Sequence, residues 1–318
     1  MGIETAAVIG AGAMGHGIAE VLARQCPTVW LHDSSAEVRE AAAGRIAASV
    51  ARLRRHDLIS KETARRIPDR IRVTGDLPEA TSTAHFVVEA VSENLPLKQE
   101  LFGTIDGYAP EEAIFATNTS SLRIADVMAR VSERRRSHLV GSHFFLPAQI
   151  VPLVEVSRTA DTDAGVFDRV VALWEACDKE PIRIERDISG YVANRLQRAL
   201  MGEALALLAE GTASAEDIDR SITQGFGLRF VVRGPLAQRD VAGLDLSAAM
   251  RYDDGGRERI DAGRQHLLDL AAAGNLGLKT GRGLLDWAGK DLDSTVADDD
   301  EALAETVARM LHRRRLGP

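Results

Sequence analysis

The sequence is poor in aromatic residues, in cysteine and in long apolar runs. Aromatic residues make up 4% of the 318 residues, so the core must be packed largely with aliphatic side chains. The two cysteines, Cys26 and Cys177, belong to no CxxC pattern, so neither a disulfide framework nor a thiolate metal site is indicated. No apolar run approaches the ~18 residues that span a bilayer, and no basic leader with a cleavable apolar stretch follows Met1. We therefore expect a cytoplasmic protein without a membrane segment.

An excess of positive charge is also missing. The chain has 39 Lys and Arg against 47 Asp and Glu, a net charge of -8, and both signs are spread along it. A nucleic-acid binder would show a dominant basic footprint, so nucleic acid is not expected as a partner. Hydrophobic residues at 45% and charged residues at 27% are typical of a globular protein, and the length suggests about two domains.

Short apolar runs alternate with helical patterns in the first part of the chain. The intervening segments, such as 13–24, 36–53 and 95–105, are long enough for crossover helices. Strand followed by helix, repeated, predicts a doubly wound α/β domain with a mostly parallel sheet over residues 1–186. The strand-like runs are 6–9, 28–31, 70–74, 85–91, 113–117, 138–145, 152–157 and 181–185.

After Arg186 the strand-like runs give way to Ala- and Leu-rich stretches. Residues 189–211 predict one long helix that Gly211 stops, and Ser214 is placed to cap a second helix. Residues 298–315 predict a solvated terminal helix, with basic residues at its end that complement the helix dipole. We expect an all-α domain over residues 187–318.

A glycine-rich turn follows the first strand directly. In Gly10-Ala11-Gly12-Ala13-Met14-Gly15, the first glycine makes the tight turn, the second lets backbone N–H groups approach a pyrophosphate, and the third lets helix pack on strand. A lone GxGxxG can be a turn without a ligand, but here it lies between a strand and a helix. The context favours a dinucleotide-binding domain of the Rossmann type.

Asp33 ends the second strand and selects among dinucleotides. Its carboxylate is placed to accept hydrogen bonds from the adenosine ribose hydroxyls. It would repel the 2'-phosphate of NADP, and Ser34 and Ser35 bring no positive charge to offset it. The prediction is NAD as cofactor, although the fingerprint alone also allows FAD.

Several separated motifs resemble the 3-hydroxyacyl-CoA dehydrogenase family, and the resemblance spans almost the whole chain. It implies a first domain that binds NAD and a second, helical domain that closes over the substrate and forms a homodimer contact. It also implies a role in fatty acid metabolism. The motifs are VIGAGAMGHGIA (8–19), VVEAVSENLPLKQELF (87–102), ATNTSSL (116–122), GSHFFLPAQIVPLVEV (141–156), DISGYVANRL (187–196) and LGLKTGRGLLDW (276–287).

Oxidation of a secondary alcohol needs a base near neutral pH that removes the hydroxyl proton while a hydride leaves the same carbon. His143, at the end of its strand, is the natural candidate, and Glu155 is placed to return beside it. A lone histidine there is more often structural, but the resemblance implies that His143 and Glu155 are the catalytic pair. It also implies that Ser120, near the nicotinamide, and Asn194 contact the reacting oxygen, although Ser120 could merely cap the next helix.

Glu93 and Lys98 match family positions that contact the nicotinamide-side ribose. The alternative is an exposed charge pair beside a helix that begins near Pro96.

The sequence departs from the family at two places. Leu146 stands where the motif after the histidine usually has asparagine. Residues 225–235 are longer than in fatty-acyl members and look more like the carnitine and gulonate dehydrogenases or the lambda-crystallin type. Arg229 or Arg233 could there bind a substrate carboxylate, although either could equally be a surface arginine.

In members that use CoA, the long helix after the second strand helps to hold the nucleotide. Here this stretch offers Ser49, Arg52, Arg54 and Arg55, which a solvated basic helix face explains as well. The leading hypothesis is NAD-dependent oxidation of a 3-hydroxyacyl thioester, with CoA as the carrier. The alternatives are a free small 3-hydroxy acid, a carrier-protein thioester, and a non-catalytic NAD-binding protein of the crystallin kind.

Overall fold

The structure is a computed structural model that describes all residues except 1, 56–57, 250–267, 293, 296–297 and 299–318. The predicted terminal helix over 298–315 lies outside the described residues apart from Asp298. The chain divides into two compact units, Met1–Leu200 and Met201–Pro318.

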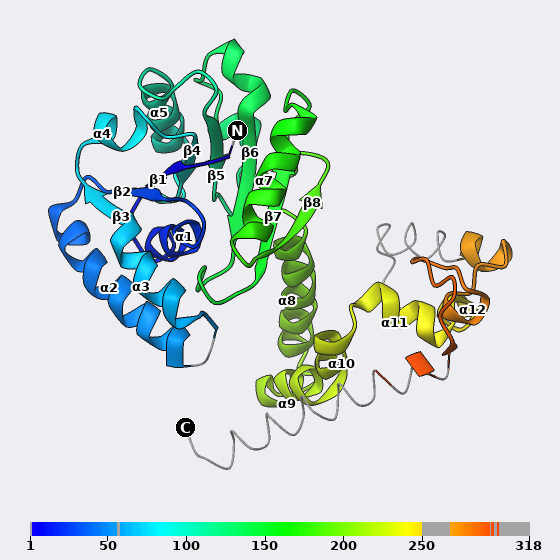
Figure 1. Cartoon of the computed structure of the whole chain (residues 1–318). Coiled ribbons are helices and arrows are strands. Elements are labelled where there is room, and N and C mark those ends of the chain that lie inside the picture. Colours follow the sequence, from blue (N-terminus) through cyan, green and yellow to red (C-terminus); the bar gives the residue numbers. More distant parts are fainter. Residues whose placement is uncertain (1, 56–57, 250–267, 293, 296–297, 299–318) are drawn as a thin grey trace. The chain divides into compact units, whose positions relative to one another are not determined.

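The first unit is an α/β fold built on one eight-stranded sheet with the order β3-β2-β1-β4-β5-β6-β7-β8 (Figure 1). Strands β1 to β6 run parallel, β7 runs antiparallel to β6, and β8 runs parallel to β7. The strands are β1 (Thr5–Ile9), β2 (Thr28–His32), β3 (Ile71–Thr74), β4 (Phe86–Glu89), β5 (Ile114–Thr117), β6 (Leu139–Phe144), β7 (Leu153–Arg158) and β8 (Glu180–Ile184). Each lies where a predicted run lies, so the doubly wound Rossmann-type sheet is confirmed.

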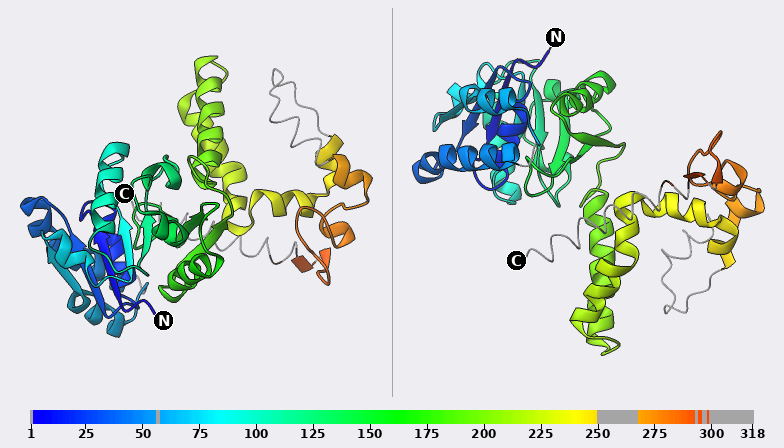
Figure 2. Two further views of the ribbon diagram at one scale, coloured as in Figure 1. Left: turned by 90° about the horizontal axis from the view of Figure 1, so that it is seen from above. Right: turned by 60° about the horizontal axis from the view of Figure 1, so that its bottom comes forward.

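Helices cover both faces of this sheet (Figures 1 and 2). Alternate residues of one strand enter different cores, because successive side chains of a strand point to opposite faces. Val8 of β1 packs with residues of α1, α2 and α7, whereas Ile9 packs with residues of α4, α5 and α6. The helical segments are α1 (Gly15–Leu22), α2 (Ala36–Arg55), α3 (Lys61–Arg70), α4 (Leu77–Thr81), α5 (Leu95–Asp106), α6 (Ile124–Val127), η1 (Glu133–His138) and α7 (Ala164–Ala176).

The helix α8 (Ala193–Ala209) begins four residues later than the predicted helix at 189–211. Gly190 and Tyr191 both have positive φ, 78° and 47°, so the chain cannot be helical there. Gly211 also has a positive φ of 69° and stands just past the end of α8, as predicted.

The second unit continues with short helical segments and an irregular stretch. Ser214 caps α9 through a hydrogen bond from Asp217 N, as its sequence position predicts. The all-α prediction for this part is confirmed for the described residues. The segments are α9 (Ala215–Ser221), η2 (Ile222–Phe226), α10 (Gly227–Val232), α11 (Pro235–Ala242), α12 (Leu244–Ala249) and η3 (Leu278–Thr280).

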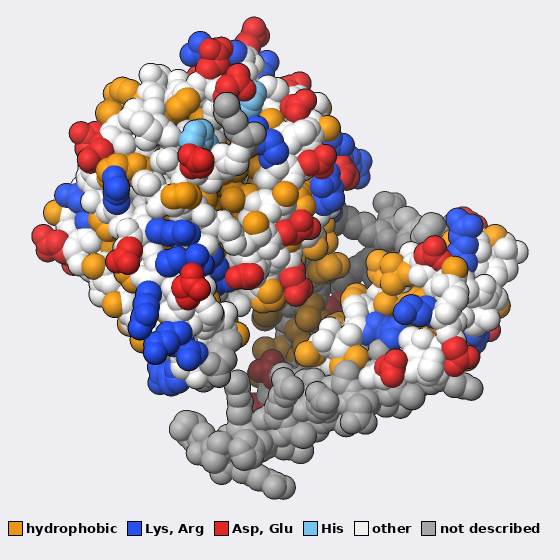
Figure 3. Space-filling model, viewed as in Figure 1, with side chains coloured by type: hydrophobic (Ala, Val, Ile, Leu, Met, Phe, Trp, Pro, Cys, Tyr) orange, Lys and Arg blue, Asp and Glu red, His pale blue; other side chains and the backbone are white. Residues whose placement is uncertain are grey.

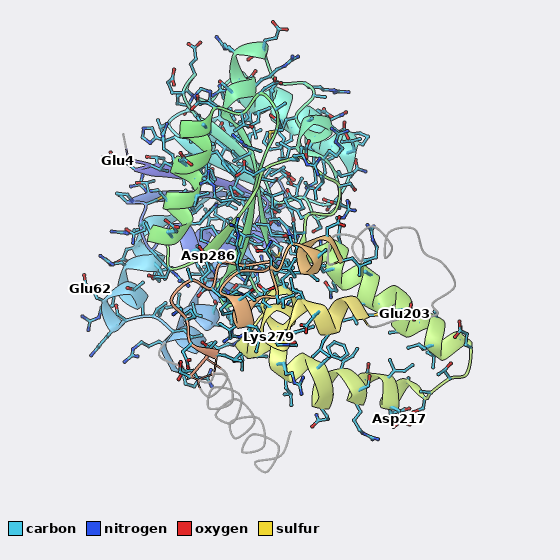
Figure 4. The ribbon with its side chains drawn as sticks, turned by 90° about the vertical axis from the view of Figure 1, so that its right-hand side faces the viewer. Glu4, Glu62, Glu203, Asp217, Lys279 and Asp286 are labelled. Carbon is cyan, nitrogen blue, oxygen red and sulfur yellow. The ribbon has the colours of Figure 1, made fainter. Side chains whose placement is uncertain are left out.

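The buried carboxylate of Asp240, on α11, organises residues 276–287 of this unit. Its oxygens accept hydrogen bonds from Leu284 N at 2.8 Å, Leu285 N at 2.7 Å and the Trp287 indole at 2.7 Å. Figure 4 marks the irregular stretch with the labels Lys279 and Asp286. One acceptor with three donors thus gives this motif its shape.

Candidate active site

His143 and Glu155 are directly opposite each other on the antiparallel strands β6 and β7. Opposite residues of two paired strands project from the same face, so the pairing brings the side chains together. The imidazole Nδ1 lies 2.8 Å from Glu155 Oε2, and the side chains are 4% and 0% exposed. With Nδ1 donating to the carboxylate, Nε2 is left as the acceptor that a general base needs.

The other oxygen of Glu155 binds the start of α8. Glu155 Oε1 accepts hydrogen bonds from Val192 N and Ala193 N, both at 2.9 Å. These N–H groups have no partner inside the helix, and a carboxylate at a helix N-terminus is favoured by the helix dipole. Glu155 therefore orients the imidazole and holds the helix that carries Asn194.

Asn194 and Ser120 are also brought together. The Asn194 amide donates from Nδ2 to the Ser120 carbonyl oxygen at 3.1 Å. The neighbouring Ser189 hydroxyl donates to the carbonyl oxygen of Ser121 at 2.6 Å. Within the described residues the Ser120 hydroxyl has no hydrogen-bond partner, and the residue is exposed at the end of β5. A hydroxyl in this position is available to a ligand.

Glu93 holds the turn that presents Ser120. Its Oε1 accepts hydrogen bonds from the Thr119 hydroxyl at 2.6 Å, Ser120 N at 3.0 Å and both Ser121 N and its hydroxyl. Burial opposes the charge of Glu93, but the hydrogen bonds from Thr119 and Ser121, together with Lys98, lower its pKa to about 2. The Glu93 carboxylate is therefore ionised at any physiological pH.

Lys98 is 1% exposed, so the alternative of an exposed charge pair is wrong for this residue. Its ammonium lies 2.6 Å from Glu89 Oε1 and 3.3 Å from Glu93 Oε2. Burial raises the pKa of Glu89, against the lowering effect of Lys98 and of hydrogen bonds that include one from Thr117. The predicted ribose contacts of Glu93 and Lys98 stay predictions, whereas Glu89 was not identified from the sequence.

The glycine-rich turn has the geometry that a dinucleotide needs. Gly10 has a φ of 104°, and a Cβ on Gly15 would lie 1.6 Å from the Gly10 carbonyl oxygen. A Cβ on Gly12 would meet no atom within 4 Å, so the fold does not require glycine there. Open space at that position suits the close approach of a pyrophosphate to backbone N–H groups and to the start of α1. Ala13 is exposed and Met14 half-buried beside it.

Asp33 follows β2 and shapes the same turn. Its carboxylate accepts hydrogen bonds from Ala11 N and Ser35 N, both at 2.9 Å. The Arg39 guanidinium donates to the carbonyl oxygens of Asp33 and Ser34, at 2.7 and 3.0 Å. The Arg39 guanidinium therefore brings a positive charge near Asp33. The prediction considered only Ser34 and Ser35 and did not include this charge. Asp33 stays half-buried and can still accept from a ribose hydroxyl.

Ser49 is not available to phosphates, because it is buried in the first unit. Its hydroxyl donates to Glu20 Oε2 at 2.7 Å and accepts from Gln149 Nε2 at 3.0 Å. Burial raises the pKa of Glu20 to about 8, and Ser49 and Arg24 lower it only in part. This network ties the loop between β6 and β7 to α1 and α2, and nothing in the sequence distinguishes Glu20 from a surface residue.

The departures from the family pattern lie on exposed or half-buried positions. Leu146, in the loop after His143, is 64% exposed. Arg229 is exposed, and the Arg233 guanidinium lies 4.9 Å from the centre of the Trp287 ring. The positions of Arg229 and Arg233 do not test the predicted contact with a substrate carboxylate.

No group of three His, Cys, Asp or Glu side chains within the described residues is arranged to hold a metal ion. Among those same residues no helix is long and apolar enough to cross a bilayer.

Comparisons with known proteins agree with this geometry. The profile described as 3-hydroxyacyl-CoA dehydrogenase, NAD binding domain, matches residues 5–188, and the profile of the C-terminal domain matches residues 190–287. A probable 3-hydroxybutyryl-CoA dehydrogenase of Bacillus subtilis is 34% identical over 91% of this chain and 99% of its own length.

Two further relatives cover nearly the whole chain. The 5-formyl-3-hydroxy-2-methylpyridine 4-carboxylate 5-dehydrogenase of Mesorhizobium japonicum is 29% identical over 98% of this chain and 99% of its own length. The crystal structure of a 3-hydroxyacyl-CoA dehydrogenase from Archaeoglobus fulgidus has a TM-score of 0.76 at 27% identity, with 95% of this chain and 99% of that chain covered. The chain belongs to the 3-hydroxyacyl-CoA dehydrogenase family and is an NAD-dependent oxidoreductase that acts on a CH–OH group.

Proposed function

We propose that the chain oxidises the hydroxyl of a 3-hydroxyacyl thioester, with CoA as the carrier, to the 3-oxo product. The observation that carries this proposal is the buried 2.8 Å contact between His143 and Glu155. His143 Nε2 accepts the hydroxyl proton, and Glu155 holds the imidazole in the required tautomer and stabilises the imidazolium that forms. Bound NAD supplies the hydride acceptor.

The residues around the pair orient the substrate. The Ser120 hydroxyl and the Asn194 amide are placed to hydrogen-bond the reacting oxygen, which fixes the alcohol against the base. Gly10, Gly12, Ala13, Met14 and Gly15 form the turn that binds the pyrophosphate. In this proposal residues 1–186 form the cofactor domain and residues 187–318 the substrate and dimerisation domain.

Asp33 completes the cofactor site by accepting from the adenosine ribose, and Glu93, Lys98 and Ser120 lie on the nicotinamide side. NADH titration by fluorescence tests the assignment of Asp33 to the adenosine side and that of the other three residues to the nicotinamide side. Tighter binding of NADPH than of NADH would contradict the role of Asp33.

A basic surface supports CoA as the carrier. Exposed basic side chains lie on α2 and α3, and they are Arg52, Arg54, Arg55, Lys61, Arg65 and Arg66. In Figure 3 blue side chains gather on the part of the first unit where Figure 1 shows these helices. Guanidinium groups suit the phosphates of CoA, and they offset locally the net charge of -8.

The decisive experiment compares NAD reduction with 3-hydroxybutyryl-CoA and with a panel of free hydroxy acids. The matched control is the N-acetylcysteamine thioester of 3-hydroxybutyrate, which keeps the thioester and lacks the phosphates. An Arg52→Glu/Arg55→Glu variant should raise KM for the CoA ester at least tenfold and leave KM for the short thioester unchanged. Equal KM values for both thioesters in the unaltered protein would contradict CoA recognition.

A free small hydroxy acid is the second candidate. The exposed Leu146 removes a polar amide from the loop after His143, and the relative from Mesorhizobium japonicum is named for a pyridine carboxylate. Turnover confined to free acids would establish this candidate instead. Activity only with the acyl group on a carrier protein would identify that carrier. NADH binding without turnover of any substrate would favour the non-catalytic alternative.

We also propose that the chain forms a homodimer. No side chain of α8 is buried, and its exposed apolar residues include Leu196 at 62%, Met201 at 54% and Leu205 at 57%. A helix with so much exposed apolar surface favours a partner. Light scattering after size exclusion should give twice the chain mass of 34.3 kDa, and Leu205→Glu should shift the protein toward the monomer.

A further inference from the structure

The aromatic ring of Tyr191 covers one face of the His143 imidazole. The ring centroids are 4.7 Å apart with an angle of 23° between the planes, and Tyr191 is 2% exposed. Phe145 meets the same imidazole edge-on, at 4.9 Å and 65°. The orientation of the imidazole is therefore limited by two aromatic rings as well as by the hydrogen bond to Glu155.

The backbone of Tyr191 has a conformation that side chains other than glycine rarely adopt. Its φ is 47°, a strained conformation that persists only when the surroundings require it. The next two residues, Val192 and Ala193, donate their N–H groups to Glu155 at 2.9 Å. One turn thus places a ring against the base and two donors against the partner of the base.

We propose that Tyr191 is a positioning residue for His143, whose ring holds the imidazole in the plane of Glu155 and stabilises its protonated form. The inference rests on the proposed function, in which His143 accepts the hydroxyl proton. The face of an aromatic ring carries partial negative charge and attracts a cation within ~6 Å of its centre. Tyr191 meets this distance, so its ring favours the imidazolium that the reaction forms.

Three acidic side chains act on Tyr191 through their charges, Lys98 is paired with one of them, Glu89, and all four residues remain in the Tyr191 variants. Glu155 of β7 contacts the imidazole directly, and Asp187 and Glu89 also act on Tyr191 through their charges. Burial raises the pKa of Tyr191, so its phenol stays neutral in the range of the test. A change in the titration of His143 on removal of the ring therefore reports the ring itself.

The test compares Tyr191→Leu, which removes the ring and keeps the site apolar, with Tyr191→Phe, which keeps the ring. Tyr108→Leu is the matched control, because Tyr108 is 46% exposed and belongs to no site described above. NMR of protein with ¹⁵N-labelled histidine follows the titration of His143, whose signal is identified by its loss in His143→Gln. This readout needs no substrate.

In Tyr191→Leu the titration midpoint of His143 should fall by about half a pH unit to one unit. The low-pH limb of kcat/KM should move with it, while NADH binding stays unchanged. Tyr191→Phe and Tyr108→Leu should behave as the unaltered protein. If Tyr191→Leu does not fold, Tyr191→Met takes its place, because the unbranched side chain adapts to irregular space.

An unchanged midpoint in the variant without the ring overturns the inference. An equal fall in Tyr191→Phe also overturns it, because the phenol rather than the ring face would then be responsible. Full turnover by His143→Gln would overturn the proposed function itself. An inactive His143→Gln with an unchanged profile in Tyr191→Leu would remove only the role of Tyr191.

Discussion

Glu155→Gln should disable the base while the fold survives. The carboxylate accepts three hydrogen bonds, from the His143 imidazole and from the backbone N–H groups of Val192 and Ala193 at the start of α8. An amide of the same shape can accept at only one end. If its oxygen keeps the two backbone donors, its NH₂ group faces His143 Nδ1, which must then accept. The proton moves to Nε2, where the alcohol proton should go.

The wrong tautomer accounts for most of the expected loss. A carboxylate-to-amide change beside a catalytic histidine in a hydrolase triad costs about 10⁴ in kcat. We expect a fall in kcat of about 10³ to 10⁴, equal to about 4–5.5 kcal/mol at ~1.4 kcal/mol per tenfold. The two bonds to backbone N–H groups lose their charge assistance, at about 1 kcal/mol each, so the free energy of unfolding should fall by about 2 kcal/mol.

Steady-state NADH formation measures the loss in kcat, and NADH fluorescence checks that cofactor binding is intact. The ¹⁵N chemical shifts of the His143 imidazole report the tautomer without any substrate. A double variant with His143→Gln should be hardly slower than either single variant, because the two residues act as one unit. A kcat within tenfold of the unaltered value, or an unchanged tautomer, would refute the reasoning.

Four further changes test the cofactor turn and the buried carboxyl group. Gly15→Ala should abolish NADH binding and destabilise the protein, because the new Cβ would meet the Gly10 carbonyl oxygen at 1.6 Å. Gly12→Ala should keep the melting temperature, because its Cβ meets no atom within 4 Å, and should weaken NADH binding at least tenfold. Normal NADH affinity in Gly12→Ala would contradict the pyrophosphate position. Asp33→Ser should reduce the preference for NADH over NADPH by about tenfold, equal to ~1.4 kcal/mol, in fluorescence titrations; an unchanged ratio would remove Asp33 as the selector. For Glu20, burial raises the folded pKa from 4.5 to about 8, so the folded form loses stability as pH rises between these values. Glu20→Gln should therefore raise the free energy of urea unfolding by about 1–3 kcal/mol at pH 8 and by little at pH 5, and an equal gain at both pH values would count against the neutral carboxyl.

The centre of the sheet could be predicted from the sequence because strands such as β4 and β5 are buried on both faces. Such strands form continuous apolar runs between helical segments, and each of the eight runs is a strand in the structure. The start of α8 could not be predicted in the same way. Tyr191 has no sequence signal for a positive φ, and Gly190 alone could have stood within a helix.

The site residues that belong to a sequence motif could be predicted, whereas those that depend on tertiary contacts could not. The structure joins His143 to Glu155 and Asn194 to Ser120 by hydrogen bonds, and the separate roles of the four residues stay proposals. In the sequence Glu89 belongs to a predicted strand. Its ion pair with Lys98 could not be predicted, because that pair depends on a helix that packs there only after folding. Charge pairs of this kind have no fixed sequence spacing.

In the hairpin of β6 and β7, the proposed catalytic pair and the family departure at Leu146 stand in different parts of the chain. His143 and Glu155 are fixed by strand register, and a shift of one residue would turn both to the other face. Leu146 lies in the loop that joins these strands and is 64% exposed, whereas the buried Gln149 ties the same loop to α1 and α2. A change at the exposed Leu146 therefore leaves the register of the proposed pair untouched, whereas exchange of the whole loop would also remove the contact of Gln149 with Ser49.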